Sequence, residues 1–226
     1  MIINPILHKY FFLNIYQMWV IYVIIALLIF WIVTQLRKKQ VVRKKVFSKR
    51  ECEHVIEVAN KYEFINDKLD TIDGQPEHQI DIFTENEVKN KELYDLSMDL
   101  YRKHLPNQDH LKVGYIFLRR YNPEDRTGVP IHFDECSVTM SVLLSDTKDF
   151  EGGKLYVFDE KTSKKFDEDG LDFMENTERG EYMDGKVLPV MEYEQGDMVM
   201  FKGGKLFHGI TPVTGGERYL LSYFFD

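Results

Sequence analysis

The pattern of hydrophobic and polar positions sets the first 36 residues apart from the rest of the chain. Residues 10–36 carry no charge, and residues 18–33 (MWVIYVIIALLIFWIV) are nearly all apolar. A helix needs about 20 apolar residues to cross the hydrocarbon core of a bilayer. Trp19, Tyr22 and Trp31 lie towards the ends of the run, as interfacial aromatic residues do. The pattern predicts an N-terminal anchor, residues 1–36, with a single transmembrane helix at about 17–36.

Two alternatives for this run are a cleaved signal peptide and a buried core helix. A signal peptide would be shorter, with a basic start and small residues at a cleavage site. Only Lys9 precedes the run, whereas six Lys and Arg residues follow it within 37–46, a predicted basic juxtamembrane linker. The positive-inside rule then places the C-terminal domain in the cytosol. The basic residues could equally lie along anionic lipid headgroups.

Helical periodicity follows in two segments. Ser48 and Glu51 form a capping-box pattern, and apolar residues recur at helical spacing to about Tyr62. Asn90 is placed to cap a second helix that ends before Pro106 and carries Leu93, Leu96 and Leu100 on one face. Between the two helices, residues 67–76 are predicted as a loop and 79–83 as a short strand.

From residue 115 onward the pattern is that of β-strands. Alternating or aromatic and aliphatic runs lie at 115–121, 138–144, 154–158, 198–201 and 219–225, separated by Gly and Pro. Several short strands without helices between them are typical of a double-sheet jelly roll. We predict a mainly β fold, a double-stranded β-helix braced by the two N-terminal helices. The folded domain is predicted at 47–226, with its barrel at about 112–226.

Residues 159–186 interrupt the β pattern, being densely charged and poor in apolar residues. Loops of this length are functional lids or disordered insertions. The segment is either a solvated acidic loop or a substrate-facing flap that favours a basic peptide.

The charge of the chain limits the kinds of partner that it can bind. The chain of 226 residues has a net charge of −8, but residues 1–45 carry seven basic and no acidic residues, which leaves about −15 on the remainder. An acidic body argues against nucleic acid as a partner, because phosphate binding needs a basic face.

Cys52 and Cys136 do not have the spacing of metal-binding cysteines and are expected to be free thiols. A disulfide between them is the alternative.

Two histidines and one aspartate supply the candidate chemistry. His132 and Asp134 are two positions apart, so on a strand both side chains leave the same face, and His208 follows Asp134 by 74 residues. Two imidazoles and a carboxylate with open positions make the facial triad of non-haem Fe(II) oxygenases. The three residues are therefore candidate Fe(II) ligands, leaving room for a chelating co-substrate and O2. The alternative is scattered surface histidines.

Arg218 stands ten residues after His208. A guanidinium fork that points into a barrel is suited to the distal carboxylate of a dicarboxylic acid. A surface salt bridge is the alternative. The strand that continues from Arg218 is mostly apolar, however, and a buried Arg needs an anionic partner.

Four stretches resemble the 2-oxoglutarate- and Fe(II)-dependent dioxygenases, in their prolyl 4-hydroxylase and procollagen lysyl hydroxylase branch. They are residues 120–134 (RYNPEDRTGVPIHFD), 150–158 (FEGGKLYVF), 195–197 (QGD) and 208–218 (HGITPVTGGER). The resemblance covers about 47–226. Leu155 stands where prolyl hydroxylases carry a Thr shortly after the Gly-Gly turn, so the finer co-substrate contacts are left open.

The resemblance implies a reaction and its site residues. The reaction is hydroxylation of a peptidyl prolyl or lysyl side chain, with decarboxylation of 2-oxoglutarate to succinate and CO2. It would use Fe(II), 2-oxoglutarate, O2 and L-ascorbate. His132, Asp134, His208 and Arg218 would be the catalytic residues. Tyr121 would help to bind the distal carboxylate, unless it is a core tyrosine bonded to backbone, and Ser222 could contribute a hydroxyl.

The resemblance and the charge rule disagree on location, because collagen-type hydroxylases of this branch act in the lumen of the endoplasmic reticulum. Two other functions stay open. One is a non-catalytic jelly-roll binding module tethered to a membrane, and the other is the same chemistry on a small molecule or a nucleic-acid base.

Overall fold

The computed structural model describes residues 22–25, 27, 40–66, 68–108 and 110–226. The chain forms two units, residues 1–40 and 41–226. Most of the predicted transmembrane helix, 17–36, lies outside the described residues. The described residues 22–25 within this range are helical. Within the described ranges no helix combines the length and the apolar character that a membrane span requires.

The second unit begins inside the predicted linker. Residues Val41–Lys45 form strand β1, which pairs antiparallel with β9 (Asp197–Phe201). The Nη2 atom of Arg43 lies 2.8 Å from a carboxylate oxygen of Asp197. The expectation that 37–46 is a linker and that folding starts at residue 47 is corrected here, because the sheet starts at Val41. The basic residues of β1 fit its place at the edge of the sheet, where Lys side chains oppose pairing with other chains.

Truncation at the two candidate starts tests this boundary. A chain of residues 38–226 should fold, and a chain of 47–226 should lose about 2–4 kcal/mol of stability. The loss combines several ladder hydrogen bonds of about 0.5–1.5 kcal/mol each with a buried carboxylate of Asp197 deprived of its cation. Urea unfolding of both chains measures the difference. Equal stabilities would mean that β1 contributes nothing, and failure of 38–226 to fold would make the N-terminal segment part of the core.

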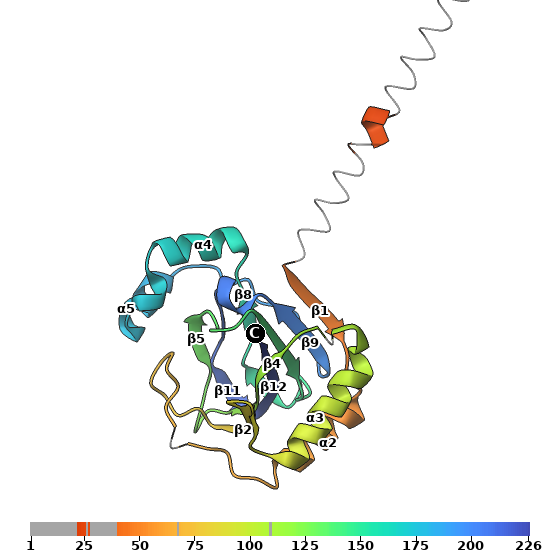
Figure 1. Ribbon diagram of the computed structural model, residues 1–226. Helices are drawn as coiled ribbons and strands as arrows, with labels where there is room; N and C mark the ends of the chain where they lie inside the picture. The colour runs from red at the N-terminus through yellow and green to blue at the C-terminus, as the bar shows by residue number, and fades with distance from the viewer. Residues whose placement is uncertain (1–21, 26, 28–39, 67, 109) are drawn as a thin grey trace, which may run out of the picture. The chain divides into compact units, whose positions relative to one another are not determined.

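The strands of the second unit form three antiparallel sheets (Figure 1). The seven-stranded sheet has the order β1-β9-β6-β12-β4-β2-β3, and a three-stranded sheet has the order β5-β10-β8. Strands β11 and β7 make a separate pair. The mainly β prediction is confirmed, and the arrangement is consistent with a jelly-roll oxygenase. The remaining strands are β2 (Gln79–Thr84), β3 (Glu87–Val88), β4 (Val113–Tyr121), β5 (Val129–His132), β6 (Val138–Leu143), β7 (Phe150–Gly152), β8 (Leu155–Val157), β10 (His208–Ile210), β11 (Val213–Gly216) and β12 (Arg218–Phe225).

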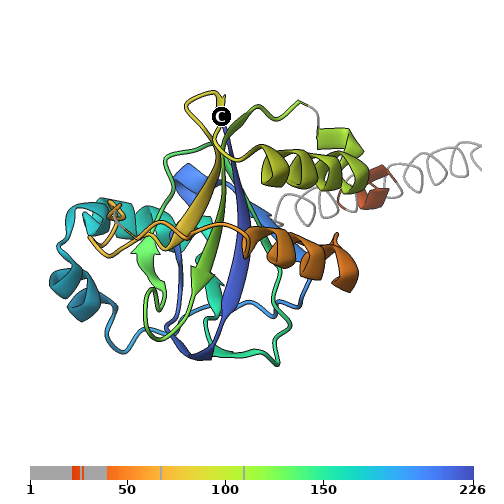
Figure 2. The same cartoon turned by 90° about the horizontal axis from the view of Figure 1, so that it is seen from below.

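Two capped helices brace the large sheet, as the sequence predicts. Helix α2 (Lys49–Ala59) starts at a capping box between Ser48 and Glu51, and α3 (Lys91–His104) starts with the side chain of Asn90 accepting from Leu93. Both helices lie on the same side of the central strands (Figure 2). Their apolar faces join alternate residues of β4 and β12, among them Leu118 and Tyr223, in one buried core. The other face of these strands is left for the barrel interior.

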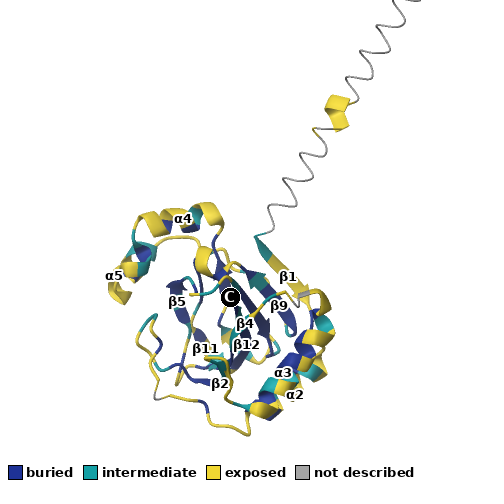
Figure 3. Ribbon diagram, in the orientation of Figure 1, coloured by how far each residue is buried: buried dark blue, intermediate teal, exposed yellow. Residues whose placement is uncertain are grey.

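The charged segment 159–186 is not the loop that its composition predicts. It forms helix α4 (Glu160–Glu168), the short 3₁₀ helix η2 (Leu171–Phe173) and helix α5 (Asn176–Met183). Most of its surface is exposed (Figure 3), but Phe166 and Leu171 are buried against Phe158 and Phe207. A few apolar residues spread over α4, η2 and α5 pack this charged segment against the barrel, and its low average hydrophobicity conceals them.

Both cysteines are free. Cys52 is buried in the core under α2, and burial raises the pKa of its thiol to about 12. The thiol is therefore protonated and packs as a small apolar group.

Candidate active site

The three predicted metal ligands meet at one end of the three-stranded sheet. His132 ends β5 and lies opposite His208, the first residue of β10, in the antiparallel register. The Nε2 atom of His132 lies 3.4 Å from Oδ1 of Asp134, and Nε2 of His208 lies 3.3 Å from Oδ2. All three side chains are buried, and one ligand atom from each lies within 4.8 Å of the others. The predicted triad is present in space as well as in sequence.

Asp134 reaches the site by a different route from the one the spacing suggests. Strand β5 ends at His132, so strand alternation does not orient Asp134. Its backbone N–H donates to the carbonyl of Gly203 at 3.2 Å, and the hydroxyl of Thr139 on β6 donates to its carboxylate. The carboxylate is thus held from the facing sheet.

Both imidazoles present the same nitrogen to the site. Nδ1 of His132 lies 2.8 Å from the carbonyl oxygen of Pro130, and Nδ1 of His208 lies 3.0 Å from that of Leu206. A carbonyl only accepts, so the acceptors assign the proton to Nδ1 and leave the Nε2 lone pair facing Asp134. Second-shell bonds of this kind orient histidine ligands of metals. Two neutral imidazoles and a carboxylate fit Fe(II).

The electrostatics of the site favour an ionised carboxylate. Burial alone would raise the pKa of Asp134, but when the imidazoles are protonated, the charge of His208 and the N–H groups of His208 and His132 hold it well below its usual range. A metal cation bound at the two Nε2 atoms would take over this role from the protons. An ionised carboxylate is the form that binds a metal.

Arg218 is a buried cation without a partner. It begins β12, faces Tyr121 in the register with β4, and is 0% exposed. None of its three guanidinium nitrogens has a hydrogen-bond partner in the described part of the chain. Its guanidinium carbon lies 5.3 Å from the centre of the Tyr121 ring, and burial lowers its pKa. An uncompensated buried charge is costly, so the site fits an anion such as the distal carboxylate of 2-oxoglutarate.

The Gly-Gly turn makes space for Arg218. Gly152 and Gly153 have φ of +75° and +57°, a region that favours glycine. A Cβ on Gly153 would lie 2.8 Å from Cδ of Arg218, and one on Gly152 would lie 2.1 Å from the carbonyl oxygen of Pro212. The predicted role of these glycines in a tight turn and close approach is confirmed.

A cavity of about 600 Å³ leads to the triad and is also lined by Tyr121 and Ser222. Ser222 is buried, and its hydroxyl lies 3.0 Å from that of Ser141.

Tyr193 also belongs to the site, and the sequence offered no reason to expect it there. Its buried hydroxyl donates to the carbonyl of Ser141 at 2.9 Å. Burial raises the pKa of Tyr193, while the charge of Arg218 acts to lower it. No local motif marks Tyr193, because its place depends on the packing of the loop before β9.

A buried ion-pair network closes one wall of the cavity. Asp70 accepts from Arg119 on β4 at 2.9 Å and from Arg126 at 3.1 Å, and Arg126 also reaches Asp73 at 2.8 Å. These contacts hold the loop around residues 70–73 beside the triad, so that Asp70, Thr71 and Ile72 line the cavity. Sequence analysis placed a loop here without assigning it a role.

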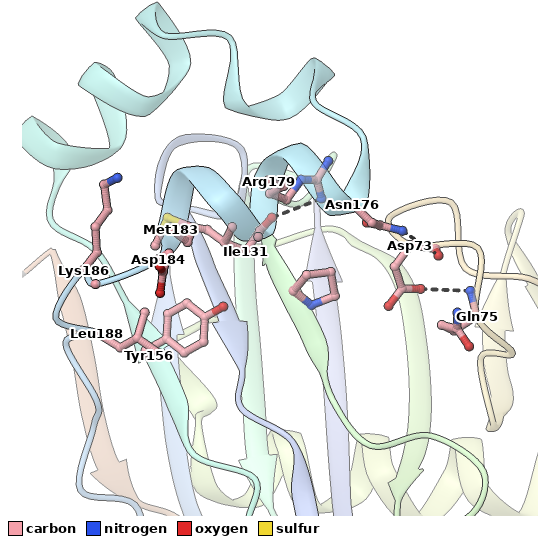
Figure 4. Close-up of a pocket in the computed structure, with 13 residues that line it drawn as sticks. Asp73, Gln75, Ile131, Tyr156, Asn176, Arg179, Met183, Asp184, Lys186 and Leu188 are labelled. Atoms are coloured by element: carbon pink, nitrogen blue, oxygen red, sulfur yellow. Dashed lines mark hydrogen bonds between the residues drawn. The ribbon is translucent and has the colours of Figure 1, made fainter.

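Arg179 of α5 connects the inserted helices to the metal strand (Figure 4). Its guanidinium donates to the carbonyl of Ile131 at 3.2 Å and to that of Met174 at 3.2 Å, and the side chain is 7% exposed. It lines both the cavity and a second hollow of about 490 Å³ that also involves Asp184 and Lys186. The two hollows therefore adjoin at Arg179.

Solved structures show the same fold at low identity. An oxidoreductase of the 2OG-Fe(II) oxygenase family from Burkholderia pseudomallei has a TM-score of 0.57 at 13% identity, with 85% of this chain and 88% of that one covered. A prolyl hydroxylase from Trichoplax adhaerens, solved with a hypoxia inducible factor peptide fragment, has a TM-score of 0.53 at 13% identity, with 86% and 87% covered. A Pseudomonas putida prolyl-4-hydroxylase has a TM-score of 0.50 at 18% identity, with 86% and 96% covered.

The sequence was also compared with curated proteins and with profiles of protein families. No curated protein sequence is significantly similar to the chain. The sequence profile of the 2OG-Fe(II) oxygenase superfamily matches residues 116–226, the stretch that supplies the triad and Arg218. Family profile, fold and site agree: residues 116–226 of the chain belong to the 2OG-Fe(II) oxygenase superfamily.

Proposed function

We propose that the protein is a peptidyl hydroxylase that acts on prolyl or lysyl side chains and converts 2-oxoglutarate to succinate and CO2. The observation that carries the oxygenase chemistry is the fully buried guanidinium of Arg218, which has no hydrogen-bond partner among the described residues and lies in the same barrel as the triad. A peptide as substrate is supported by the cavity of about 600 Å³ and by the peptide bound to the similar Trichoplax adhaerens enzyme.

Each side chain has a task in this reaction. His132, Asp134 and His208 would hold Fe(II), which with 2-oxoglutarate and O2 supplies the oxidation of an unactivated C–H bond. Arg218 would bind the distal carboxylate of 2-oxoglutarate through two parallel hydrogen bonds. Thr139 keeps the Asp134 carboxylate in place by donating to it. Tyr121 and Ser222 line the cavity and are proposed as further contacts of the co-substrate.

The N-terminal residues are proposed to anchor this domain in a lipid bilayer. The apolar run of 18–33 and the basic residues that follow it favour a cytosolic catalytic domain. The lumen of the endoplasmic reticulum is the alternative location. L-Ascorbate is proposed as the reductant that restores oxidised iron, on the resemblance alone.

Succinate release tests the proposal. Residues 38–226 would be supplied with Fe(II), 2-oxoglutarate and O2, with and without ascorbate, and with Pro-rich or Lys-rich peptides. We expect slow release without peptide and faster release with one peptide class, whose product then gains one oxygen atom in its mass spectrum. Release that neither peptide accelerates would favour a small-molecule substrate. No release by protein shown to contain iron would favour a non-catalytic binding module.

A further inference from the structure

The cations of the substrate cavity are already engaged by the protein. Arg119 donates to Asp70 at 2.9 Å and to the side-chain carbonyl of Gln79 at 2.6 and 2.9 Å. The guanidinium of Arg179 donates to backbone carbonyls, including that of Ile131. Both side chains are buried, and the terminal nitrogens of both guanidinium groups donate to protein acceptors.

Three carboxylates of the same cavity have no such compensation. Glu135 follows the metal ligand Asp134, Asp172 lies in η2, and Asp226 follows β12. Glu135 and Asp226 are exposed and Asp172 is half-buried. Among the residues that the structure describes, no cation lies within ion-pair distance of these three side chains. They come from three separate segments, so the cavity receives negative charge from more than one side.

Aromatic side chains form a wall of the same cavity. Phe117 lies 4.9 Å from Tyr115 and 5.4 Å from Phe224 between ring centres, and all three residues line the cavity. The guanidinium carbon of Arg119 lies 5.2 Å from the centre of the Phe117 ring. One face of this wall therefore already holds a cation, as the negative faces of aromatic rings do.

The second hollow, on the other side of Arg179, also has an acidic lining. Asp184 is exposed there and has no ion-pair partner within the described ranges. The one lysine of that hollow, Lys186, follows helix α5 and is turned back onto it, with its Nζ atom 3.8 Å from the centre of the Tyr182 ring. A peptide that extends from the cavity past Arg179 would meet a fourth uncompensated carboxylate.

We propose that the cavity selects a substrate with a Lys or Arg side chain beside the reacting residue. The carboxylates of Glu135, Asp172 and Asp226 attract the positive charge, and the aromatic wall packs against the aliphatic stem. This proposal rests on the proposed function, because it assumes that the cavity is the substrate site of the oxygenase. It assigns the selection to the cavity and not to the acidic surface in general.

Binding of matched peptides to the full chain tests the proposal. The probes are three labelled peptides with one central proline, flanked by lysine, alanine or glutamate, with binding followed by fluorescence anisotropy at two salt concentrations. Three charge contacts at exposed or half-buried carboxylates, each worth two- to threefold in affinity, give the lysine-flanked peptide an advantage of about tenfold over the alanine-flanked one. The advantage should shrink at high salt, because exposed charges are screened.

Charge-neutral variants locate the effect. Combining Glu135→Gln, Asp172→Asn and Asp226→Asn should remove the preference for lysine while leaving binding of the alanine-flanked peptide unchanged. Combining Glu53→Gln, Glu57→Gln and Asp99→Asn makes the same change of charge at exposed positions of helices α2 and α3, away from the cavity, and should keep the preference.

The outcomes separate the two proposals. Equal binding of the three peptides, no binding of any, or a preference that survives in the triple variant would overturn the charge selection. Succinate release without peptide by the same preparations reports on the oxygenase. Its persistence in either case confines the failure to the charge selection, and its absence from iron-loaded wild type refutes the proposed function.

Discussion

Replacing Asp134 with alanine is expected to weaken Fe(II) binding at least 100-fold and to abolish succinate release. The carboxylate contributes one of the three ligand atoms and carries the only negative charge among them. Loss of a ligand should exceed the 10- to 100-fold effect of losing a second-shell partner. His132→Ala should behave in the same way. Metal content after dialysis and anaerobic titration with Fe(II) measure the effect.

Two neighbouring substitutions calibrate this prediction. Glu135→Ala removes the next carboxylate along the chain, which is exposed, and should leave iron bound. Thr139→Ala removes the hydroxyl that donates to Asp134 and should weaken iron binding by about 10- to 100-fold. Unchanged iron content in Asp134→Ala would refute the ligand assignment.

Replacing Arg218 with methionine is expected to raise the 2-oxoglutarate requirement by about 30- to 700-fold while iron stays bound. Removing one member of a buried, hydrogen-bonded charge pair costs about 2–4 kcal/mol, which corresponds to that range. The Michaelis constant for 2-oxoglutarate in the succinate assay measures it. Arg120→Met is the matched control, because Arg120 stacks 4.5 Å from the ring centre of Phe64 on the other face of β4.

Thermal unfolding gives the same prediction a second readout. Without co-substrate, Arg218→Met should unfold at a higher temperature than wild type, because it removes a buried charge for which the described part of the chain supplies no hydrogen-bond partner. Wild type should gain stability as 2-oxoglutarate is added, by mass action on the folded state, and the variant should not. A variant with wild-type 2-oxoglutarate dependence would show that Arg218 does not bind the co-substrate.

The fold was predictable where local rules decide it. Ser48 and Asn90 start their helices as predicted, because a cap satisfies amide groups a few residues away. Strands β4, β6, β9 and β12 agree with prediction within two residues, because alternation along a strand is also local. The insertion was predicted wrongly, because its two buried apolar residues find partners only in the folded barrel.

Some residues of the site were likewise predictable from the sequence, and others were not. His132, Asp134, His208 and Arg218 could be found by residue type and spacing, since the chemistry of Fe(II) and of a dicarboxylate allows few alternatives. Thr139 and Tyr193 could not, because a hydroxyl that donates to a carboxylate or a carbonyl has no distinctive neighbours in sequence.

What the sequence by itself determined is the set of reactive groups and the local elements that carry them. What only the tertiary structure decided is which groups are already paired. Arg119 and Arg218 both lie on barrel strands, yet Arg119 is neutralised by Asp70, 49 residues away, and Arg218 has no partner among the described residues. Arg43 pairs with Asp197, which lies 154 residues away in the sequence. The segment that was predicted as a linker pairs with β9 as a strand. Pairing of charges depends on distances across the folded barrel, which short-range sequence patterns do not encode.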